Sequence, residues 1–225
     1  MNMKQFAVAI DGPSGAGKST IAKAVAAKLA IVYVDTGALY RTIGLAVQRR
    51  GISMDDNAGI LSVLPEIRVE LTYRDGSQCV LLDGEDVSGL IRTPEISMYA
   101  SKVSALPAVR AFLLDLQRDM ARTHSVVMDG RDIGTVILPD AEVKIFLTAS
   151  DEKRAERRWL ELREKGEEVT VEDVLSDMRR RDAQDSSRAA APLRQAEDAV
   201  LVDTSALTLE ESIQAVLDVI RGRMA

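Results

Sequence analysis

Short apolar runs alternate along this chain with longer segments whose apolar residues recur every three to four positions. Five of the short runs predict strands, which lie at residues 6–10, 31–35, 125–129, 143–147 and 199–203. Because helical patterns separate these runs, the chain is expected to form a parallel sheet with helices packed against it, an α/β fold. Three predicted strands end in an aspartate, namely Asp35, Asp129 and Asp203. Functional residues are expected there, because such sheets bind ligands beyond the carboxyl ends of their strands.

The stretch from about 51 to 122 breaks this alternation. Apolar and polar residues alternate from 67 to 73, Asp75-Gly76 is a strong turn signal, and the alternation resumes from 80 to 82. This pattern predicts an inserted antiparallel hairpin, followed by two helices of which the second begins near Pro107. A final amphipathic helix is predicted after Asp203. We therefore expect one domain, with a core of about 1–50 and 123–225 and an inserted region of about 51–122.

Composition narrows the class of protein. With 225 residues, 46% of them hydrophobic, the chain can bury the core of one enzyme-sized domain. A net charge of -6 argues against a general nucleic-acid binder. The single cysteine, Cys79, and the single histidine, His124, make a Cys/His zinc site improbable. Phe6–Ile10 is too short for a signal peptide, and no run approaches the ~20 apolar residues of a membrane span. A soluble cytoplasmic protein is expected, with no nucleic acid and no membrane as partner.

The strongest motif is GPSGAGKS, which joins the first predicted strand to a helix. It satisfies the phosphate-loop spacing G-x-x-x-x-G-K-[ST], in which backbone N–H groups surround phosphate oxygens at a helix N-terminus. Lys18 is expected to reach the β and γ phosphates of ATP, and the Ser19 hydroxyl to ligate Mg²⁺. The expected ATP-binding residues are Gly12, Pro13, Ser14, Gly15, Ala16, Gly17, Lys18, Ser19 and Thr20.

Asp129 ends a predicted strand and is the candidate second metal ligand. A carboxylate at this place can hold Mg²⁺ directly or through water. The alternative is an ordinary turn residue at the end of a strand. Asp11, directly before the phosphate loop, has no evident role in the sequence.

A phosphate loop alone does not separate kinases from ATPases, GTPases or regulatory switches. The Asn-Lys-x-Asp motif of GTPases is absent, as are the usual signatures of guanylate and adenylate kinases. Four further segments are present: DTGALYR at 35–41, GEDVSGLIRTPE at 84–95, DGRDIGT at 129–135 and RRRDAQDSSRAAAPL at 179–193. In order and spacing, over nearly the whole chain, they resemble the bacterial cytidylate kinase family. This resemblance implies ATP and CMP or dCMP as substrates, a five-stranded P-loop fold with a monophosphate-binding insert, a mobile lid at about 155–170, and a monomer.

The resemblance also implies roles for individual residues. The positions that match base-facing residues of the family are Ser101, Arg110 and Asp132. Those that match residues holding or framing the monophosphate are Tyr40, Arg41 and Arg131. The remaining nucleotide contacts match Thr36, Arg181, Asp185 and Arg188. Many relatives carry serine where this chain has Thr36, which keeps the hydroxyl and changes the packing.

The residue types agree with these roles. Cytosine has an exocyclic amino group that donates hydrogen bonds and ring atoms that accept them. A hydrogen-bond acceptor such as Asp132 beside a donor such as Arg110 suits this arrangement. Arg181, Asp185 and Arg188 are spaced to share one helix face, where two guanidinium groups would flank a carboxylate. The alternative is that these residues form a row of ion pairs on the solvent-exposed face of a surface helix.

Phosphoryl transfer to an anionic acceptor needs no dedicated base, and charge neutralisation is expected to carry it. The residues expected to do so are Lys18, Arg41, Arg131, Arg157 and Arg181. Arg157 shares a predicted helix face with Arg154 and Arg158, where nearby glutamates could pair with them instead. Other small-molecule P-loop kinases, of guanylate, uridylate or shikimate type, and a non-catalytic nucleotide-binding regulatory module remain alternatives.

Overall fold

The structure, a computed structural model, describes residues 5–74, 77–164 and 166–224. The chain divides into two compact units. Residues 1–33 and 124–225 form the first, here called the core unit, and residues 34–123 form the second, here called the hairpin unit.

A five-stranded sheet belongs to the core unit except for the last two residues of one edge strand, which belong to the hairpin unit. The strand order of the sheet is β2 (Val32–Asp35), β6 (Val126–Gly130), β1 (Ala7–Asp11), β7 (Val143–Thr148) and β8 (Val200–Asp203). β1 pairs in parallel with both β6 and β7, and β7 pairs in parallel with β8. The predicted parallel sheet and its five strands are confirmed. β1 lies at the centre and every one of its residues is buried, because a parallel sheet is covered on both faces.

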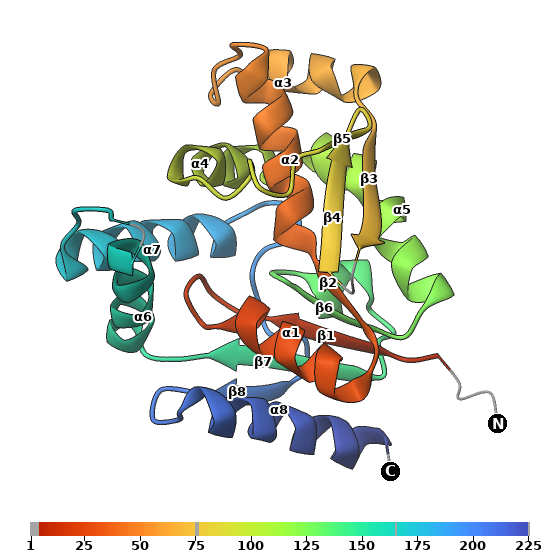
Figure 1. Cartoon of the computed structure of the whole chain (residues 1–225), viewed down its shortest axis with the longest axis vertical. Helices are drawn as coiled ribbons and strands as arrows, with labels where there is room; N and C mark the ends of the chain where they lie inside the picture. The colour runs from red at the N-terminus through yellow and green to blue at the C-terminus, as the bar shows by residue number, and fades with distance from the viewer. Residues whose placement is uncertain (1–4, 75–76, 165, 225) are drawn as a thin grey trace. The chain divides into compact units, whose positions relative to one another are not determined.

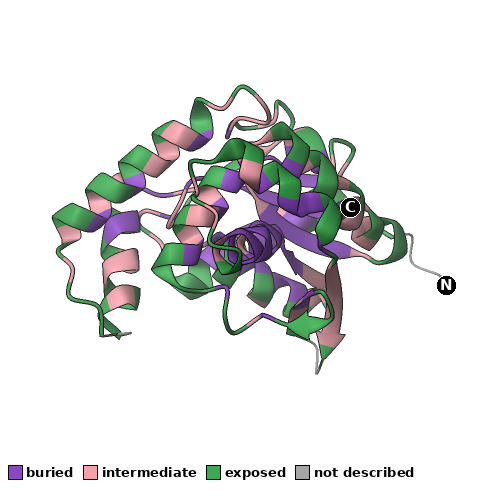
Figure 2. Cartoon of the chain, turned by 90° about the horizontal axis from the view of Figure 1, so that it is seen from above, coloured by how far each residue is buried: buried purple, intermediate pink, exposed green. Residues whose placement is uncertain are grey.

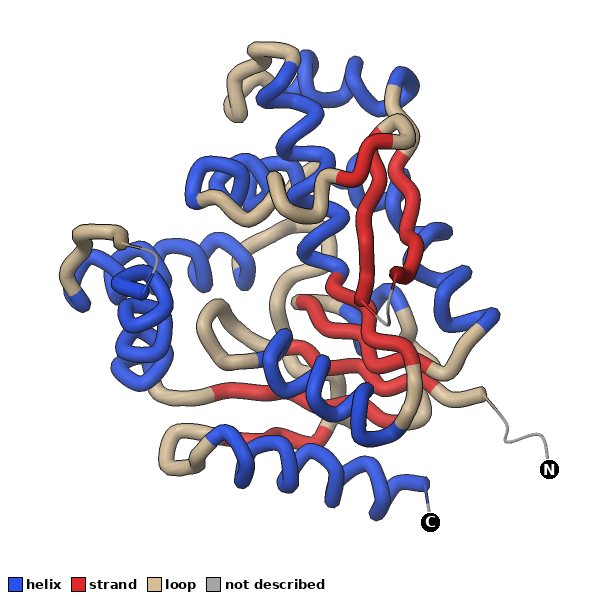
Figure 3. The backbone as a smooth tube through the Cα atoms, in the orientation of Figure 1, coloured by secondary structure: helices blue, strands red, loops and turns tan. Residues whose placement is uncertain are grey.

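Two helices of the core unit, α1 (Lys18–Leu29) and α8 (Leu209–Met224), lie side by side along the sheet (Figures 1 and 3). Their apolar stripes meet the strands in one cluster, in which Val25 of α1 and Val216 of α8 are fully buried beside Val8 and Ile10. The predicted C-terminal amphipathic helix is therefore present. This packing fixes the first turn of α1, which carries the end of the phosphate loop.

A pair of helices, α6 (Asp151–Glu164) and α7 (Val171–Ser186), follows β7. They pack on each other around a small apolar cluster of their own that contains Val174 and Met178. α7 begins with a capping box, in which Thr170 and Asp173 satisfy each other's backbone N–H groups. Trp159 of α6 packs against this cluster and donates from its indole N–H to the Val169 carbonyl at 3.0 Å. Trp159 is thus a packing residue of this helix pair.

The hairpin unit is built around α2 (Thr36–Arg49). Its other elements are α3 (Asn57–Val63), the 3₁₀ turn η1 (Leu64–Glu66), β3 (Val69–Arg74), β4 (Ser77–Leu82), β5 (Glu85–Asp86), α4 (Pro94–Val103) and α5 (Pro107–Thr123). β3, β4 and β5 form an antiparallel sheet, which confirms the predicted hairpin. The expected turn at Asp75-Gly76 lies outside the described residues.

α2 is buried on nearly every side, so the hydrophobic core of the hairpin unit surrounds it. Figure 2 shows it end-on as a coil in the colour of buried residues. Ile43 on α2 is fully buried with Ile60 of α3, Val80 of β4 and Leu113 of α5 in this core. In the part of the chain that the structure describes, no helix has the length and apolar character needed to cross a bilayer.

Candidate active site

The phosphate loop runs from the end of β1 to the start of α1. Its first glycine, Gly12, has φ 153°, and a Cβ there would lie 2.0 Å from the carbonyl oxygen of Leu147 on β7. Only glycine fits this close approach of two backbones. Gly17, with φ 83°, is the N-cap of α1 and provides no capping side chain. The first N–H groups of α1 therefore have no side-chain cap, and an anion can take them.

Lys18, the first residue of α1, is buried inside this loop. Its ammonium group donates to the Pro13 carbonyl at 2.7 Å. Its pKa is lowered to about 7, mainly by burial and also by the Arg131 guanidinium, while Asp129, Asp11 and Asp185 act in the opposite direction. A triphosphate would supply the negative charge that this lysine lacks, so binding it favours the protonated form.

Ser19 and Asp129 face each other at the carboxyl end of β6. The Ser19 hydroxyl donates to Asp129 Oδ2 at 2.8 Å, and the Tyr33 hydroxyl donates to Asp129 Oδ1 at 2.9 Å. Asp129 itself is only 4% exposed. A hydroxyl and a carboxylate beside a phosphate loop are hard oxygen donors, so these residues fit Mg²⁺. The sequence pointed to Ser19 and Asp129, but nothing in its pattern pointed to Tyr33.

Asp185 of α7 forms ion pairs with arginines that are expected to bind the acceptor nucleotide. Its carboxylate accepts from Arg131 Nε at 2.7 Å and from an Arg188 terminal nitrogen at 2.5 Å. Burial opposes ionisation of Asp185, but Arg131, Arg188 and Arg181 outweigh it, and the net effect lowers the pKa of Asp185. The loop after β6 and the end of α7 are therefore joined by an ionised carboxylate.

One detail of this cluster corrects the sequence-based expectation. Arg181 and Asp185 lie on α7, but the helix ends at Ser186, so Arg188 is not on the same helix face. The chain then turns at Ala191, which has φ 52°, and the Leu193 N–H returns to the Asp185 carbonyl at 2.9 Å. Helical spacing was wrong for Arg188 because this loop ends the helix. The side chain still reaches Asp185.

A second ionic cluster braces the phosphate loop, and the sequence did not predict it. Arg154, a buried residue of α6, donates to the Ser14 carbonyl at 2.6 Å and to Asp182 of α7 at 2.5 Å. Asp182 in turn accepts the Ser14 N–H at 3.0 Å. Both backbone groups of one phosphate-loop residue are thus held by side chains from the helix pair. Arg154 also pairs with Asp151, so its partners are aspartates and not the glutamates considered from the sequence.

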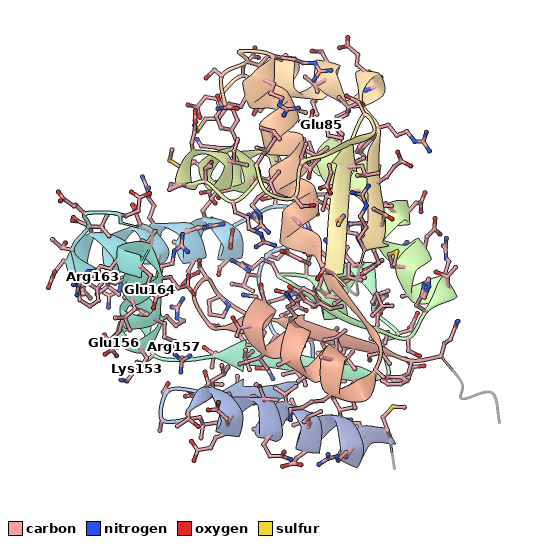
Figure 4. All side chains as sticks on the ribbon, viewed as in Figure 1. Glu85, Lys153, Glu156, Arg157, Arg163 and Glu164 are labelled. Carbon is pink, nitrogen blue, oxygen red and sulfur yellow. The ribbon has the colours of Figure 1, made fainter. Side chains whose placement is uncertain are left out.

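Arg157 lies in the middle of α6, the helix that follows β7, and is labelled in Figure 4. Its guanidinium donates to the hydroxyl of Thr204 at 3.0 Å and to the carbonyl of Thr204 at 2.8 Å. Thr204 directly follows β8. In this structure Arg157 therefore ties α6 to the end of β8. Its expected part in phosphoryl transfer stays a prediction.

The hairpin unit holds a cluster around Asp35, the N-cap of α2. The Asp35 carboxylate accepts from Arg41 at 2.8 Å and from Arg92 at 3.2 Å, and it also caps the Ala38 N–H at 2.9 Å. Gln78 of β4 pairs with the Asp35 backbone in both directions, accepting its N–H at 2.8 Å and donating to its carbonyl at 3.2 Å. Arg92 and Gln78 are additions to the sequence-based set.

The other expected acceptor residues of the hairpin unit lie on three helices. Tyr40 and the buried Thr36 are on α2, Ser101 is on α4 and Arg110 is on α5. The Arg110 guanidinium lies over the Tyr40 ring, 5.4 Å from its centroid, and donates to the Ser104 carbonyl at 3.0 Å. This cation–π contact holds the charged group of Arg110 in a fixed orientation.

Asp132 belongs to the core unit, where it is 3% exposed and directly precedes the π-helical turn η2 (Ile133–Ile137). Its carbonyl accepts the N–H groups of Val136 and Ile137. Ser101 and Arg110, with which Asp132 is expected to read a base, belong to the hairpin unit. The joint reading of cytosine by these three residues stays a prediction.

Comparison with solved structures supports the fold. An uncharacterized protein from Eubacterium ventriosum matches with a TM-score of 0.53 at 13% identity, covering 96% of this chain and 99% of that one. At this identity the likeness extends to the fold alone.

Sequence comparison finds relatives of much higher identity. A cytidylate kinase of Caldicellulosiruptor saccharolyticus is 53% identical over 216 residues, which cover 96% of each chain. A cytidylate kinase of Syntrophotalea carbinolica is 47% identical over 220 residues, covering 98% of this chain and 94% of that one. The family model described as cytidylate kinase matches residues 8–222, a span that includes the phosphate loop, Asp129 and the arginine cluster at Asp185. The chain belongs to the cytidylate kinase family.

Proposed function

We propose that this chain is an ATP-dependent kinase that transfers the γ-phosphoryl group of ATP to CMP or dCMP, giving ADP and CDP or dCDP. One observation carries the proposal: Lys18 of the phosphate loop lies within electrostatic range of Arg131, Asp129 and Asp185. The lysine that binds the donor phosphates and the arginine expected at the acceptor phosphate therefore act on one place in the core unit. Membership in the cytidylate kinase family supports the choice of acceptor.

The donor side uses the uncapped start of α1 and Lys18. Backbone N–H groups of residues 15–20 donate to phosphate oxygens, because Pro13 has no N–H and that of Ser14 is donated to Asp182, and the lysine neutralises the β and γ phosphates. The brace made by Arg154 and Asp182 keeps Ser14 in place while the charge on the nucleotide changes. Because these groups are in position before the reaction, little reorganisation is needed as the bond breaks.

The transfer itself needs positioning and positive charge. A phosphate oxygen of CMP forms a bond to the γ phosphorus, while the bond to the oxygen that leaves with ADP breaks. We assign the stabilisation of charge on the transferring group to Lys18, Arg131 and Arg181 in the core unit, with Arg157 as a further candidate. Loss of one such donor is expected to raise the barrier by about 3 kcal/mol.

Mg²⁺, when bound, would neutralise phosphate charge, and we assign its protein ligands to Ser19 and Asp129. The 2.8 Å hydrogen bond between these residues already brings a hydroxyl and a carboxylate oxygen together. Tyr33 holds the other oxygen of Asp129 and fixes the orientation of the carboxylate.

To the hairpin unit we assign acceptor binding by Thr36, Tyr40, Arg41, Ser101 and Arg110. Arg92 joins this set, because it shares the Asp35 carboxylate with Arg41 and two guanidinium groups suit a monophosphate. In the core unit, Asp132 is assigned to the base, and Asp185 and Arg188 to the sugar and phosphate.

Water must be excluded, or ATP would be hydrolysed. We assign this task to closure of the segment at about 155–170, the expected lid. Within this segment the Trp159 indole N–H donates to the Val169 carbonyl at 3.0 Å, which joins its two sides. We further propose a cytoplasmic monomer, in keeping with its soluble nucleotide substrates.

The decisive experiment measures ADP formation by the purified protein with CMP, dCMP, UMP, GMP and shikimate. Strong turnover with the first two only is expected. Preference for another acceptor would identify a different small-molecule kinase. Nucleotide binding without acceptor-dependent turnover would identify a regulatory module and contradict the proposal.

A further inference from the structure

Asp11, the last residue of β1, is a buried carboxylate that the proposed reaction does not use. It is 4% exposed and directly precedes the phosphate loop. Its Oδ1 accepts the backbone N–H of Ile133, and its Oδ2 accepts that of Gly134, both at 2.8 Å. Both donors lie in the first residues of η2, more than a hundred positions away in the sequence.

These two N–H groups need an acceptor from elsewhere. The first N–H groups of a helical turn have no partner within the turn. In η2 the internal bonds begin later, with the N–H groups of Val136 and Ile137. Asp132 occupies the N-cap position, yet its side chain makes no capping hydrogen bond. Asp11 therefore caps η2 from a neighbouring strand.

Sheet register brings the two segments together. In the parallel pairing of β1 with β6, Asp11 lies opposite Gly130, directly before Arg131. The approach is close, because a Cβ on Gly134 would lie 3.4 Å from Asp11 Oδ2 and 3.1 Å from the side chain of Lys144. The carboxylate thus sets the spacing between the end of β1 and the turn that follows Arg131 and Asp132.

We propose that Asp11 is a positioning residue for the acceptor, whose carboxylate fixes η2 and thereby orients Arg131 and Asp132. Asparagine cannot replace it, because a carboxamide has one acceptor oxygen and would turn an NH₂ group toward the second N–H. The carboxylate persists although burial raises its pKa to about 6. The charged groups that face it are Asp132, which adds to this shift, and Lys18, which opposes it. This inference rests on the proposed function, since it concerns the acceptor of that reaction.

The test compares Asp11→Asn with the wild-type protein in steady-state kinetics with CMP, UMP and ATP. Loss of a hydrogen bond to a charged group corresponds to at least about a tenfold effect, which is expected as a rise in the KM for CMP. The ratio of kcat/KM for CMP to that for UMP is expected to fall, while the KM for ATP changes less, because Asp11 is one of the lesser influences on Lys18. If Asp11 only stabilised the fold, its loss would change the KM for CMP and the KM for ATP to the same extent.

Two further variants keep the outcome unambiguous. Gly134→Ala leaves the carboxylate in place and puts a methyl group 3.1 Å from the Lys144 side chain, a contact tight enough to shift η2 or Lys144, so the KM for CMP is again expected to rise more than the KM for ATP. Asp56→Asn is the matched control, because Asp56 also accepts a backbone N–H, that of Gly59 at the start of α3 in the hairpin unit. It is expected to keep the wild-type KM for CMP and for ATP.

If Asp11→Asn and Gly134→Ala both keep the wild-type KM for CMP, or raise the KM for CMP and for ATP equally, the inference is overturned. If the wild-type protein itself does not phosphorylate CMP, the proposed function fails first.

Discussion

The hydroxyl of Ser19 donates a 2.8 Å hydrogen bond to the carboxylate of Asp129, although the two residues are 110 positions apart in the sequence. This contact brings together one oxygen from the first turn of α1 and one from the end of β6. Two hard oxygen ligands at this distance are preorganised for a divalent cation.

Replacement of either residue should therefore raise the requirement for Mg²⁺. For Ser19→Ala we expect the Mg²⁺ concentration at half-maximal ADP formation to rise by about tenfold, the effect of losing one charge-assisted contact. Ser62→Ala is a matched control, because the Ser62 hydroxyl donates to the Gly59 carbonyl within α3. A Ser19→Ala variant with the wild-type Mg²⁺ dependence would remove this residue from the metal site.

The brace on Ser14 should contribute to stability as well as to ATP binding. Arg154→Met leaves Asp182 without its buried partner, and loss of one member of such a pair lowers the free energy of unfolding by about 3 kcal/mol. Urea unfolding would measure this loss, and a rise in the KM for ATP should accompany it. Arg158→Met on the same helix removes an exposed pair with Glu161, so it should change stability by less than about 1 kcal/mol. Equal effects of the two variants would contradict the assignment of a brace.

Gln78 should influence the acceptor through Asp35. It makes two hydrogen bonds to the Asp35 backbone, and Asp35 holds Arg41 and Arg92. Gln78→Ala is expected to raise the KM for CMP by up to about thirtyfold, from two contacts of about 1 kcal/mol each, with an unchanged KM for ATP. The control is Gln214→Ala, since the Gln214 side chain donates to the exposed Asp218 on its own helix. An unchanged KM for CMP would show that the Asp35 cluster keeps its geometry without Gln78.

Asp132 should determine which base the kinase accepts. Its carboxylate is expected to accept from the amino group of cytosine, which uracil lacks. Asp132→Ala should reduce the preference for CMP over UMP, measured as a ratio of kcat/KM values, by at least about tenfold while ATP binding is retained. Asp140→Ala, an exposed aspartate that follows the same turn, should keep the wild-type preference. Unaltered discrimination in Asp132→Ala would assign base reading to another residue.

The burial of Asp11 predicts a dependence of stability on pH. Its pKa is raised from 3.8 to about 6, so the folded state holds this proton more tightly than the unfolded state does. The corresponding stabilisation is present in full below pH 3.8 and is lost as the pH rises to about 6. Two pKa units correspond to about 3 kcal/mol. The stability of Asp11→Asn relative to wild type should therefore increase by about this amount from acidic to neutral pH in urea unfolding, and a flat difference would show an ordinary pKa.

The positions of the strands, the phosphate loop and the hairpin followed from the sequence alone. Each of these features has a local signature: β-rich apolar runs, a glycine spacing between a strand and a helix, and alternation around a turn. The structure confirms the strands at Ala7–Asp11 and Val126–Gly130, whose apolar runs are local features of the sequence although the two strands pair with each other. The family motifs likewise pointed to Arg131 and Asp185, whose side chains the structure joins in an ion pair.

Tertiary structure decided which distant groups meet. Asp11 reaches Ile133, Arg154 reaches Ser14, and Gln78 reaches Asp35 through sheet register and helix packing. No periodicity of the chain encodes such contacts, because a shift of one residue in strand pairing would send the same side chains to the opposite face. The prediction that Arg188 shares a helix face with Asp185 was also wrong, because the helix ends at Ser186 and the Leu193 N–H then donates to the Asp185 carbonyl. Local sequence pattern thus determined the helices and strands and the functional residues that lie on them. The packing of these elements determined which distant side chains contact and orient the functional residues.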